Sequence, residues 1–183
     1  MVKNIVIIGL PQTGKSTLLK SVLDSYEGII TGLITTEMRE NDERVGFKMG
    51  NYYRGDHVNP FAKVIARIDF DSNIKVSKYC VNISEINKQA LSQWRVSITP
   101  KHLLYLDEIG EMQMYSQVFT ELAQKYLDTP NICIMTVSEK YTCNFIEDIK
   151  KREDIELIEL TLENRDRMKT YILEKIAAFS KNI

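Results

Sequence analysis

The stretch Gly9-Leu10-Pro11-Gln12-Thr13-Gly14-Lys15-Ser16-Thr17 (GLPQTGKST) follows directly on the apolar run of residues 5–8. It matches the pattern GxxxxGK[ST], whose glycines permit a tight backbone path and whose successive N–H groups bind anions at the start of a helix. The lysine of this pattern reaches the β- and γ-phosphates of a nucleotide, and the serine or threonine hydroxyl binds Mg²⁺. We therefore expect residues 9–17 to bind nucleotide phosphates, between a buried strand and a helix that begins near Ser16.

A second motif ends another apolar run. Leu103–Leu106 predicts a buried strand, and Asp107 and Glu108 follow it immediately. We expect Asp107 to hold Mg²⁺ opposite Ser16, through water, and Glu108 to orient a water molecule for attack on the γ-phosphate. Many small-molecule and nucleotide kinases lack a carboxylate at this place, so the adjacent pair favours hydrolysis. The two residues would also suit a strand end that caps the next helix.

Other polar residues are weaker candidates. Thr136 stands at the end of the strand predicted over residues 132–137, where a polar side chain can sense the γ-phosphate or the attacking water, and ordinary strand-end turn chemistry explains it equally well. His57 and His102 are isolated, without metal-ligand spacing, and are expected to be structural. The sequence does not choose a catalytic arginine finger among Arg39, Arg44, Arg54, Arg67 and Arg165.

The composition excludes several classes of protein. The 183 residues include 24 Lys plus Arg and 25 Asp plus Glu, spread without long runs of one sign, so no DNA or RNA partner is expected. The N-terminal apolar run is too short for a membrane span and lacks a signal-peptide cleavage site, so we expect a cytoplasmic protein without a membrane partner. Cys80, Cys133 and Cys143 have no CxxC spacing and predict reduced residues in or near the core.

Apolar runs alternate with helical patterns along most of the chain. After the first strand and helix, strands are predicted over 103–106, 132–137 and 156–160, and helices over 84–94, 114–126, 145–151 and 163–179, the last with Thr161 as its N-cap. Residues 28–39 and 44–50 predict an antiparallel hairpin with a turn at 40–43, and residues 51–66 an irregular surface segment. The pattern predicts a three-layer α/β fold in one domain over residues 1–183, with a mostly parallel sheet, helices on both faces and an added antiparallel hairpin.

With both motifs placed, the chain resembles one family: the small P-loop nucleoside-triphosphatases that include the thermophile nucleoside-triphosphatases and the vertebrate cancer-related nucleoside triphosphatase. The resemblance rests on GLPQTGKST (9–17), TGLITTEMRENDERVGFKM (31–49), LYLDEIGEMQMYSQVF (104–119) and FIEDIKKREDIELIELTLENRD (145–166). These segments cover most of the chain in the family's order, and the DEIG-x-M and LTxENRD motifs are far more specific than a phosphate loop alone.

The resemblance implies a RecA-like P-loop fold and slow, Mg²⁺-dependent hydrolysis of ATP, GTP and other nucleoside triphosphates to diphosphate and phosphate, with loose choice of base. Carried over by motif, residues 14–17 bind phosphates and metal, and Asp107 and Glu108 take the metal and water roles. Arg39 lies in the family's Glu-x-Arg segment and Arg165 in its Asn-Arg-Asp segment. Either is a candidate contact with the γ-phosphate.

Three residues depart from the family's pattern. Gln12 stands where glycine is usual, and a left-handed backbone there would cost a non-glycine residue roughly 1–2 kcal/mol. Ser77, in VSKYCVN (76–82), occupies what is commonly a glycine. Gln113 replaces the usual glutamate, which removes any charge that this position supplies. The residues of the core chemistry are intact. These departures therefore bear on turnover rate and substrate range.

The sequence thus predicts a nucleoside-triphosphatase in which Lys15 and Mg²⁺ neutralise charge on the transferring phosphoryl group and Glu108 positions water. A lone domain without a partner's arginine is expected to be slow. Residues 87–90 (NKQA) lack the aspartate of the guanine-reading NKxD signature, so guanine specificity is unsupported.

Two alternatives stay open. A phosphotransferase would cover an acceptor, such as a nucleoside or nucleotide, with the hairpin or with residues 51–68, and Arg54 is compatible with an arginine-bearing lid. A nucleotide-responsive binding module would use slow hydrolysis to time its association with a protein or RNA. The near-neutral charge argues against RNA, and nothing in the sequence speaks for or against a protein partner.

Overall fold

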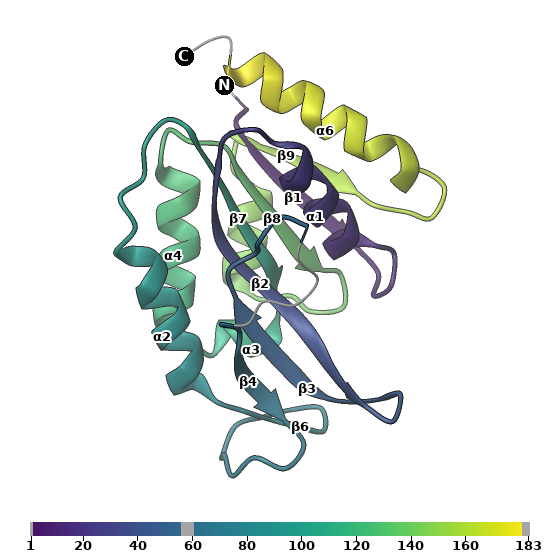
Figure 1. The fold of residues 1–183 in the computed structure, drawn as a ribbon, viewed down its shortest axis with the longest axis vertical. Helices are drawn as coiled ribbons and strands as arrows, with labels where there is room; N and C mark the ends of the chain where they lie inside the picture. Colours follow the sequence, from purple (N-terminus) through teal and green to yellow (C-terminus); the bar gives the residue numbers. More distant parts are fainter. Residues whose placement is uncertain (1, 56–60, 181–183) are drawn as a thin grey trace.

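The computed structural model describes residues 2–55 and 61–180, in which strands and helices form an α/β fold (Figure 1). In chain order the elements are β1 (Asn4–Gly9), α1 (Lys15–Ser25), β2 (Ile29–Glu40), β3 (Glu43–Gly50), β4 (Lys63–Arg67), β5 (Lys75–Val76), β6 (Tyr79–Val81), α2 (Ile83–Trp94), β7 (His102–Ile109), α3 (Glu111–Met114), α4 (Gln117–Asp128), β8 (Cys133–Ser138), α5 (Asn144–Lys150), β9 (Ile155–Glu159) and α6 (Arg165–Ser180). The strands form one nine-stranded sheet in the order β5-β6-β4-β3-β2-β7-β8-β1-β9.

The parallel half of the sheet, from β2 to β9 in that order, positions the two predicted motifs. The loop of residues 9–17 follows β1, and β7 carries Asp107 and Glu108 near its end. β8 lies between these strands and pairs in parallel with both. The carboxyl ends of the three strands therefore meet at one edge of the sheet, which is where α/β proteins bind ligands.

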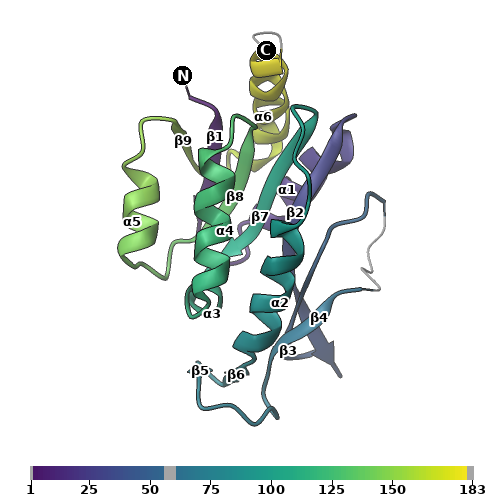
Figure 2. The ribbon, with the colours of Figure 1, turned by 90° about the vertical axis from the view of Figure 1, so that its left-hand side faces the viewer.

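Helices cover both faces of this half (Figures 1 and 2). α1 and α6 pack on one face, in an apolar cluster that includes Ile5, Ile7 and Ile172. α2, α4 and α5 pack on the other face, in a cluster that includes Val6 and Phe119. Neighbouring residues of β1 enter opposite clusters because side chains alternate across a strand, and each large apolar side chain buried in this way contributes about 1.5–3 kcal/mol. The predicted three-layer α/β architecture is confirmed.

The antiparallel part of the sheet is larger than the predicted hairpin. β2 and β3 form that hairpin, and β4, β6 and β5 extend it, so that four of the eight strand pairings in the described part are antiparallel. The prediction of an irregular segment over residues 51–66 is wrong from Lys63 onward, because β4 gains its order by pairing with β3, which local sequence does not reveal. Residues 56–60, including His57, lie outside the described residues.

Two predicted helix boundaries also differ. The helix expected over residues 114–126 is split, since Ser116 N-caps α4 by accepting a hydrogen bond from Phe119 N at 3.0 Å. Thr161 does not directly precede α6, which begins at Arg165. Thr161 and Asn164 instead bond each other reciprocally, with Thr161 N donating to Asn164 Oδ1 at 2.9 Å and Asn164 N donating to Thr161 Oγ1 at 3.3 Å. Several polar residues near a helix start can satisfy its free N–H groups, so sequence alone does not choose between them.

The three cysteines are free thiols, as predicted. Cys80 and Cys133 are buried and Cys143 is partly buried. His102 is also buried, and its Nδ1 accepts a hydrogen bond from Thr99 N at 3.0 Å, which is a structural contact.

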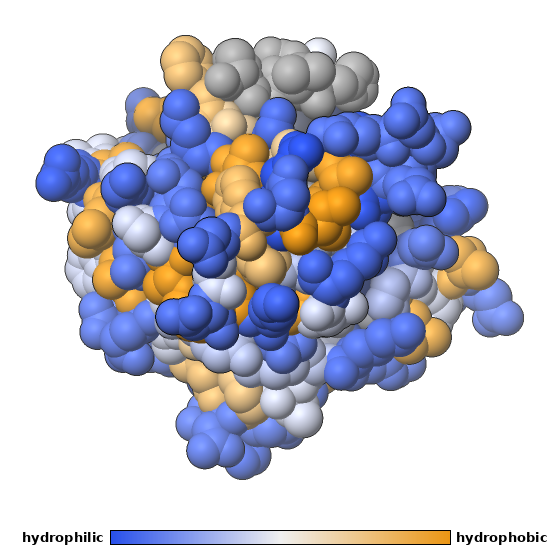
Figure 3. Space-filling model, turned by 90° about the horizontal axis from the view of Figure 1, so that it is seen from below, coloured by the Kyte–Doolittle hydropathy of each residue, from blue (hydrophilic) through white to orange (hydrophobic). Residues whose placement is uncertain are grey.

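At the end of the molecule where β6 lies in Figure 1, hydrophobic side chains are exposed among hydrophilic ones (Figure 3). None of the described helices is long and apolar enough to cross a membrane.

Two of the departures from the family's pattern have left-handed backbone. Gln12 has a φ of 68°, which confirms the strain anticipated in the loop, and Ser77 has a φ of 54° in the turn between β5 and β6. Glycine adopts these angles freely, whereas a residue with a Cβ is strained there. Both positions therefore keep a side chain at a conformational cost.

Replacing Ser77 by glycine is expected to raise the free energy of unfolding by about 0.5–1 kcal/mol. Glycine removes the left-handed strain from the folded state. It also increases the conformational entropy of the unfolded chain, which offsets part of the gain in stability. Urea unfolding measures the change. Ser92→Gly, at an exposed position inside α2, is the matched control and is expected to lower stability by about 0.5 kcal/mol. A loss of stability in Ser77→Gly would show that residue 77 carries no such strain.

Candidate active site

The loop after β1 closes around its own lysine. Lys15 is buried at the start of α1, and its Nζ donates to the carbonyl oxygens of Gly9 at 2.8 Å and Leu10 at 3.1 Å. A Cβ on Gly9 would lie 2.7 Å from the carbonyl oxygen of Leu160, so the close approach of two backbones requires glycine there. The first N–H groups of α1 have no intrahelical partner, which is the arrangement that binds phosphates at helix N-termini.

Ser16 joins this loop to β7. Its Oγ donates to Asp107 Oδ1 at 3.0 Å, and Thr136 Oγ1 on β8 donates to the same carboxylate oxygen. Burial raises the pKa of the Asp107 carboxyl, against the hydrogen bonds from Thr136 and Ser16 and the positive charges of Lys20 and Lys15. Ionising Asp107 in this place costs free energy, and a bound cation would offset that cost.

The second oxygen of Asp107 fits a metal ion. Asp107 Oδ2 is buried and has no hydrogen-bond partner among the described residues. Together with the Ser16 hydroxyl, it offers the oxygen ligands that Mg²⁺ prefers. Mg²⁺ commonly takes one or two protein oxygens and completes its shell with phosphate oxygens and water. The residues present therefore suit Mg²⁺ at the β- and γ-phosphates of a nucleotide.

Glu108 lies next to Asp107 in β7 and lines a cavity together with Ser16. The register of β7 against β8 shifts between Leu106 and Ile109, so both acidic residues stand where the regular pairing is interrupted. Burial raises the pKa of the Glu108 carboxyl, while the charge of Lys15 lowers it and the charge of Asp107 raises it. A carboxylate with a raised pKa is a stronger base, which suits a group that accepts a proton from an attacking nucleophile.

Gln113 limits the negative charge around Glu108. A Cβ on Gly110 would lie 3.3 Å from Glu108 Oε1 and 3.4 Å from Gln113 Oε1, so both side chains pass close to Gly110. Gln113 is buried, and its Nε2 donates to Thr35 Oγ1 at 3.1 Å. A glutamate at position 113 would place a further carboxylate, besides Asp107, near Glu108 and raise the pKa of Glu108 further. With glutamine there, Glu108 ionises more readily.

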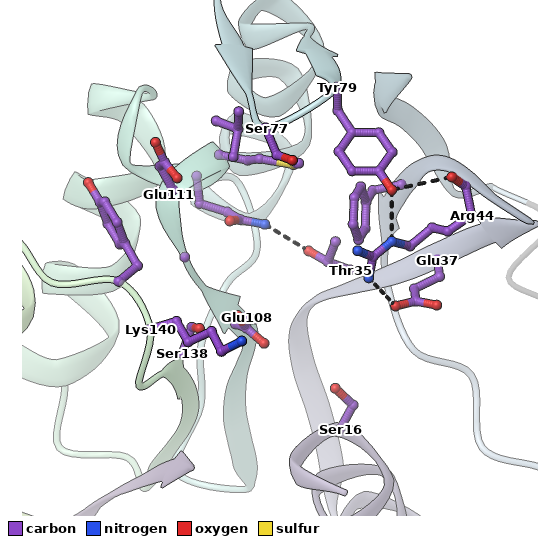
Figure 4. Close-up of a pocket in the computed structure, with 16 residues that line it drawn as sticks. Ser16, Thr35, Glu37, Arg44, Ser77, Tyr79, Glu108, Glu111, Ser138 and Lys140 are labelled. Carbon is purple, nitrogen blue, oxygen red and sulfur yellow. Dashed lines mark hydrogen bonds and ion pairs between the residues drawn. The ribbon is translucent and has the colours of Figure 1, made fainter. Parts of the chain in front are cut away.

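The cavity has a volume of about 440 Å³ and extends from Ser16 and Glu108 to the β2–β3 hairpin. Figure 4 shows Ser16, Glu108 and Arg44 entering it from different sides. Arg44 is held in place, since its Nε donates to Tyr79 Oη at 2.8 Å and its NH1 to Glu37 Oε1 at 2.7 Å. Arg44 is thus the arginine of the hairpin that faces the cavity.

The two arginines predicted to contact the γ-phosphate are not brought to Ser16 and Glu108. Arg39 is not among the residues that line the cavity, and it pairs with Glu37 Oε2 at 2.9 Å. Arg165 lines a separate pocket of about 430 Å³ that also includes Gly14 and Thr17. A γ-phosphate contact by either arginine stays a prediction, as does a sensor role for Thr136.

Arg54, the arginine compatible with an acceptor lid, lies at the other end of α1. It donates to the carbonyl oxygen of Leu23 at 3.0 Å and to that of Gly28. The phosphate loop precedes the N-terminal end of the same helix. Arg54 therefore supports the fold at a distance from the candidate site.

Sequence reasoning did not single out Thr35, Glu37 and Tyr79, which line the cavity, and it left Arg44 as one of five arginines. The alternation of β2 was a usable signal, because Thr35 and Glu37 are two residues apart and share a face of the strand. Alternation does not carry over to Arg39, because the register of β2 against β3 shifts between Met38 and Arg39. Which of the two arginines, Arg39 or Arg44, faces the cavity therefore depends on a strand irregularity that cannot be predicted from the sequence.

Comparisons with known proteins agree with this geometry. A family model described as NTPase matches residues 4–173. The nucleoside-triphosphatase THEP1 of Thermotoga maritima is 32% identical over 169 residues, which cover 92% of each chain. The cancer-related nucleoside-triphosphatase homolog of Mus musculus is 27% identical over 179 residues, which cover 92% of this chain and 93% of that one. The crystal structure of THEP1 from the hyperthermophile Aquifex aeolicus matches with a TM-score of 0.73 at 25% identity, over 94% of this chain and 98% of that one.

Replacing Asp107 by asparagine is expected to raise thermal stability at pH 7 in buffer free of Mg²⁺ and nucleotide. The pKa of this acid is raised in the folded state, so stability is lost as the pH rises through the folded-state pKa and is regained as the pH falls toward the ordinary aspartate value of 3.8. The gain at pH 7, about 0.5–2 kcal/mol, is therefore expected to shrink at pH 4.5.

Asp71→Asn is the matched control for this measurement, because Asp71 is exposed. It is expected to change stability little at either pH. If Asp107→Asn lowers stability at pH 7, or if its gain does not depend on pH, the ionised Asp107 carboxylate is not a source of instability.

Proposed function

The chain belongs to the NTPase family and is a nucleoside-triphosphatase, and from this premise we propose that it hydrolyses nucleoside 5′-triphosphates to diphosphate and phosphate at the site described above. The observation that carries the proposal is the pair of carboxylates at the end of β7. Asp107 bonds Ser16 and keeps one buried oxygen without a partner among the described residues, while Glu108 lines the adjoining cavity. Residues 9–17 bind the phosphates, and Lys15 and Glu108 are the catalytic residues.

Hydrolysis at this site is mainly positioning and electrostatics. Lys15 exchanges the carbonyl oxygens of Gly9 and Leu10 for oxygens of the β- and γ-phosphates. Glu108 accepts a hydrogen bond from a water molecule on the cavity side and takes its proton as the water oxygen bonds to the γ-phosphorus. The bond from that phosphorus to the β,γ-bridging oxygen breaks, and the nucleoside diphosphate leaves with the electron pair.

Ser16 and Asp107 are the residues that would hold Mg²⁺ in the active protein. When bound, Mg²⁺ supplies charge neutralisation at the phosphates. Thr136 acts as a positioning residue, because its hydroxyl donates to Asp107 Oδ1 and leaves Oδ2 available. The orphaned buried oxygen supports this metal site, since a carboxylate oxygen kept from water and protein donors is otherwise costly.

We propose loose choice of base and slow turnover. The separate pocket beside Thr17 presents Arg165 and Lys169, whose positive charges suit phosphate oxygens and do not select one base edge over another. In the cavity on the other side, Arg44 is engaged by Glu37 and Tyr79. An arginine finger accelerates phosphoryl transfer by about 10³–10⁵-fold, so a site whose arginine is engaged elsewhere is expected to be slow.

The domain organisation, cellular location and partners of the enzyme are also part of the proposal. Residues 1–183 act as one catalytic domain, since residues 9–17, Asp107 and Thr136 come from distant parts of the chain and meet in one site. The near-equal count of 24 basic and 25 acidic residues supports a cytoplasmic enzyme of small-molecule triphosphates, without nucleic-acid or membrane partners.

Replacing Glu108 by glutamine is expected to lower phosphate release from γ-labelled ATP or GTP by about 10²-fold or more, because glutamine cannot take the proton of the attacking water. The measurement uses protein, Mg²⁺ and triphosphate alone. Nucleotide affinity is expected to change little, since Glu108 contributes to the chemical step and not to phosphate binding.

Glu139→Gln is the matched control, because Glu139 is exposed and follows Ser138 at the end of β8. It is expected to keep phosphate release within about twofold of the unaltered protein. If phosphate release persists in Glu108→Gln, Glu108 is not the group that takes the proton of the attacking water. An unaltered protein that binds Mg²⁺ and ATP and releases no phosphate would overturn the proposed hydrolysis itself.

A further inference from the structure

The cavity beside Glu108 is much larger than hydrolysis requires. Its volume is about 440 Å³, whereas a water molecule occupies about 30 Å³ of the liquid. The triphosphate does not account for the difference, because a separate pocket of about 430 Å³, lined by Gly14 and Thr17, adjoins the same loop and can hold the rest of the nucleotide. Cavities of roughly 300–1,000 Å³ are the usual size of small-molecule sites. The space beyond the γ-phosphate therefore matches a second ligand in size.

The far wall of this cavity is aromatic and rigid. The rings of Phe47 and Tyr79 lie 5.0 Å apart, centroid to centroid, at 76°. The Arg44 guanidinium lies 5.2 Å from the Phe47 centroid and 5.6 Å from that of Tyr79, and hydrogen bonds to Tyr79 and Glu37 hold it (Figure 4). Such a wall offers stacking area together with fixed donors and acceptors, which suits a planar heteroaromatic ring.

The charges of the lining select against an anionic ligand. Its carboxylates are Glu37, Glu108 and Glu111, and its cations are Arg44 and Lys140. Arg44 is already paired with Glu37 at 2.7 Å, so one unengaged cation, Lys140, faces two further carboxylates in this described lining. Binding a phosphorylated acceptor takes charge-assisted donors, commonly arginines, that are free to engage it. The cavity is therefore better suited to an uncharged ligand.

We propose that this cavity binds an uncharged heteroaromatic compound bearing a hydroxyl group, such as a nucleoside, and that the protein transfers the γ-phosphoryl group to that hydroxyl. The proposal rests on the proposed function, because Glu108 serves both reactions. The acceptor oxygen bonds to the γ-phosphorus, its proton passes to Glu108, and the bond to the β,γ-bridging oxygen breaks. The products are a phosphomonoester and a nucleoside diphosphate, and water takes the acceptor's place when the cavity holds none.

The test follows the label from γ-labelled ATP with Mg²⁺ in three reactions. One contains no acceptor, one contains adenosine, guanosine, cytidine, uridine and thymidine, and one contains the corresponding monophosphates. We expect free phosphate in the first, labelled nucleoside monophosphate in the second with correspondingly less free phosphate, and no labelled diphosphate formed from the pool in the third. Calorimetric titration of the protein with the nucleosides, in the presence of Mg²⁺ and ADP, reports binding independently of transfer.

A variant that fills the cavity sharpens the test. Val76 borders the cavity at the edge strand β5, and Val76→Trp is expected to lower transfer to nucleosides by about tenfold or more while hydrolysis stays within about twofold. Leu91→Trp, at an exposed position on α2, is the matched control and is expected to leave both reactions unchanged.

The outcomes separate the two proposals. A protein that hydrolyses ATP, binds none of the nucleosides and labels none of them overturns the acceptor site and leaves the hydrolase intact. Transfer that is the same in Val76→Trp as in the unaltered protein also overturns it, as does preferred labelling of the monophosphates. Absence of phosphate release in the reaction without acceptor overturns the proposed hydrolysis, whatever happens in the other two.

Discussion

The contact between Ser16 and Asp107 is the interaction on which the rest of the site depends. It joins the loop after β1 to β7, two strands away, and this is possible because β8 lies between them and supplies Thr136 to the same carboxylate oxygen. Both hydroxyls occupy Oδ1, so Oδ2 stays buried without a partner in the described chain. A carboxylate in that state is costly in the folded protein and well prepared for a cation, which explains why a stable fold would retain it.

The parallel and antiparallel halves of the sheet form different parts of the site. The parallel half, packed between two apolar clusters, holds the phosphate loop and the carboxylates rigidly at one edge. The antiparallel half builds the opposite wall of the cavity, with Arg44 on β3 and Tyr79 on β6. In the proposed reactions, β7 determines what happens to the γ-phosphate, whereas the hairpin and its extension determine which acceptor can enter the cavity. Changes in the antiparallel strands are therefore expected to alter the choice of acceptor without disturbing the chemistry at Asp107 and Glu108.

The parts of this account that follow from sequence are those governed by local patterns. The glycines around Lys15, the apolar run before Asp107 and the hairpin turn each specify their own structure, and all three are found in place. The cavity wall was not predictable, because it depends on pairings between distant segments and on the irregularity after Met38 that separates Arg39 from Arg44. The strain at Gln12 was foreseeable from its place in the loop. The effect of Gln113 on the charge around Glu108 could be recognised only from the structure, which places the two side chains close together.

The most direct test of the central claim is a crystal structure of the protein with Mg²⁺, ADP and aluminium fluoride as a stand-in for the transferring phosphoryl group. The account predicts Mg²⁺ about 2.1 Å from the Ser16 hydroxyl, with Asp107 Oδ2 facing the ion directly or through one water. It also predicts the Glu108 carboxylate hydrogen-bonded to the water opposite the leaving oxygen. Mg²⁺ bound away from Ser16 and Asp107, or a different side chain holding that water while Glu108 points elsewhere, would contradict it.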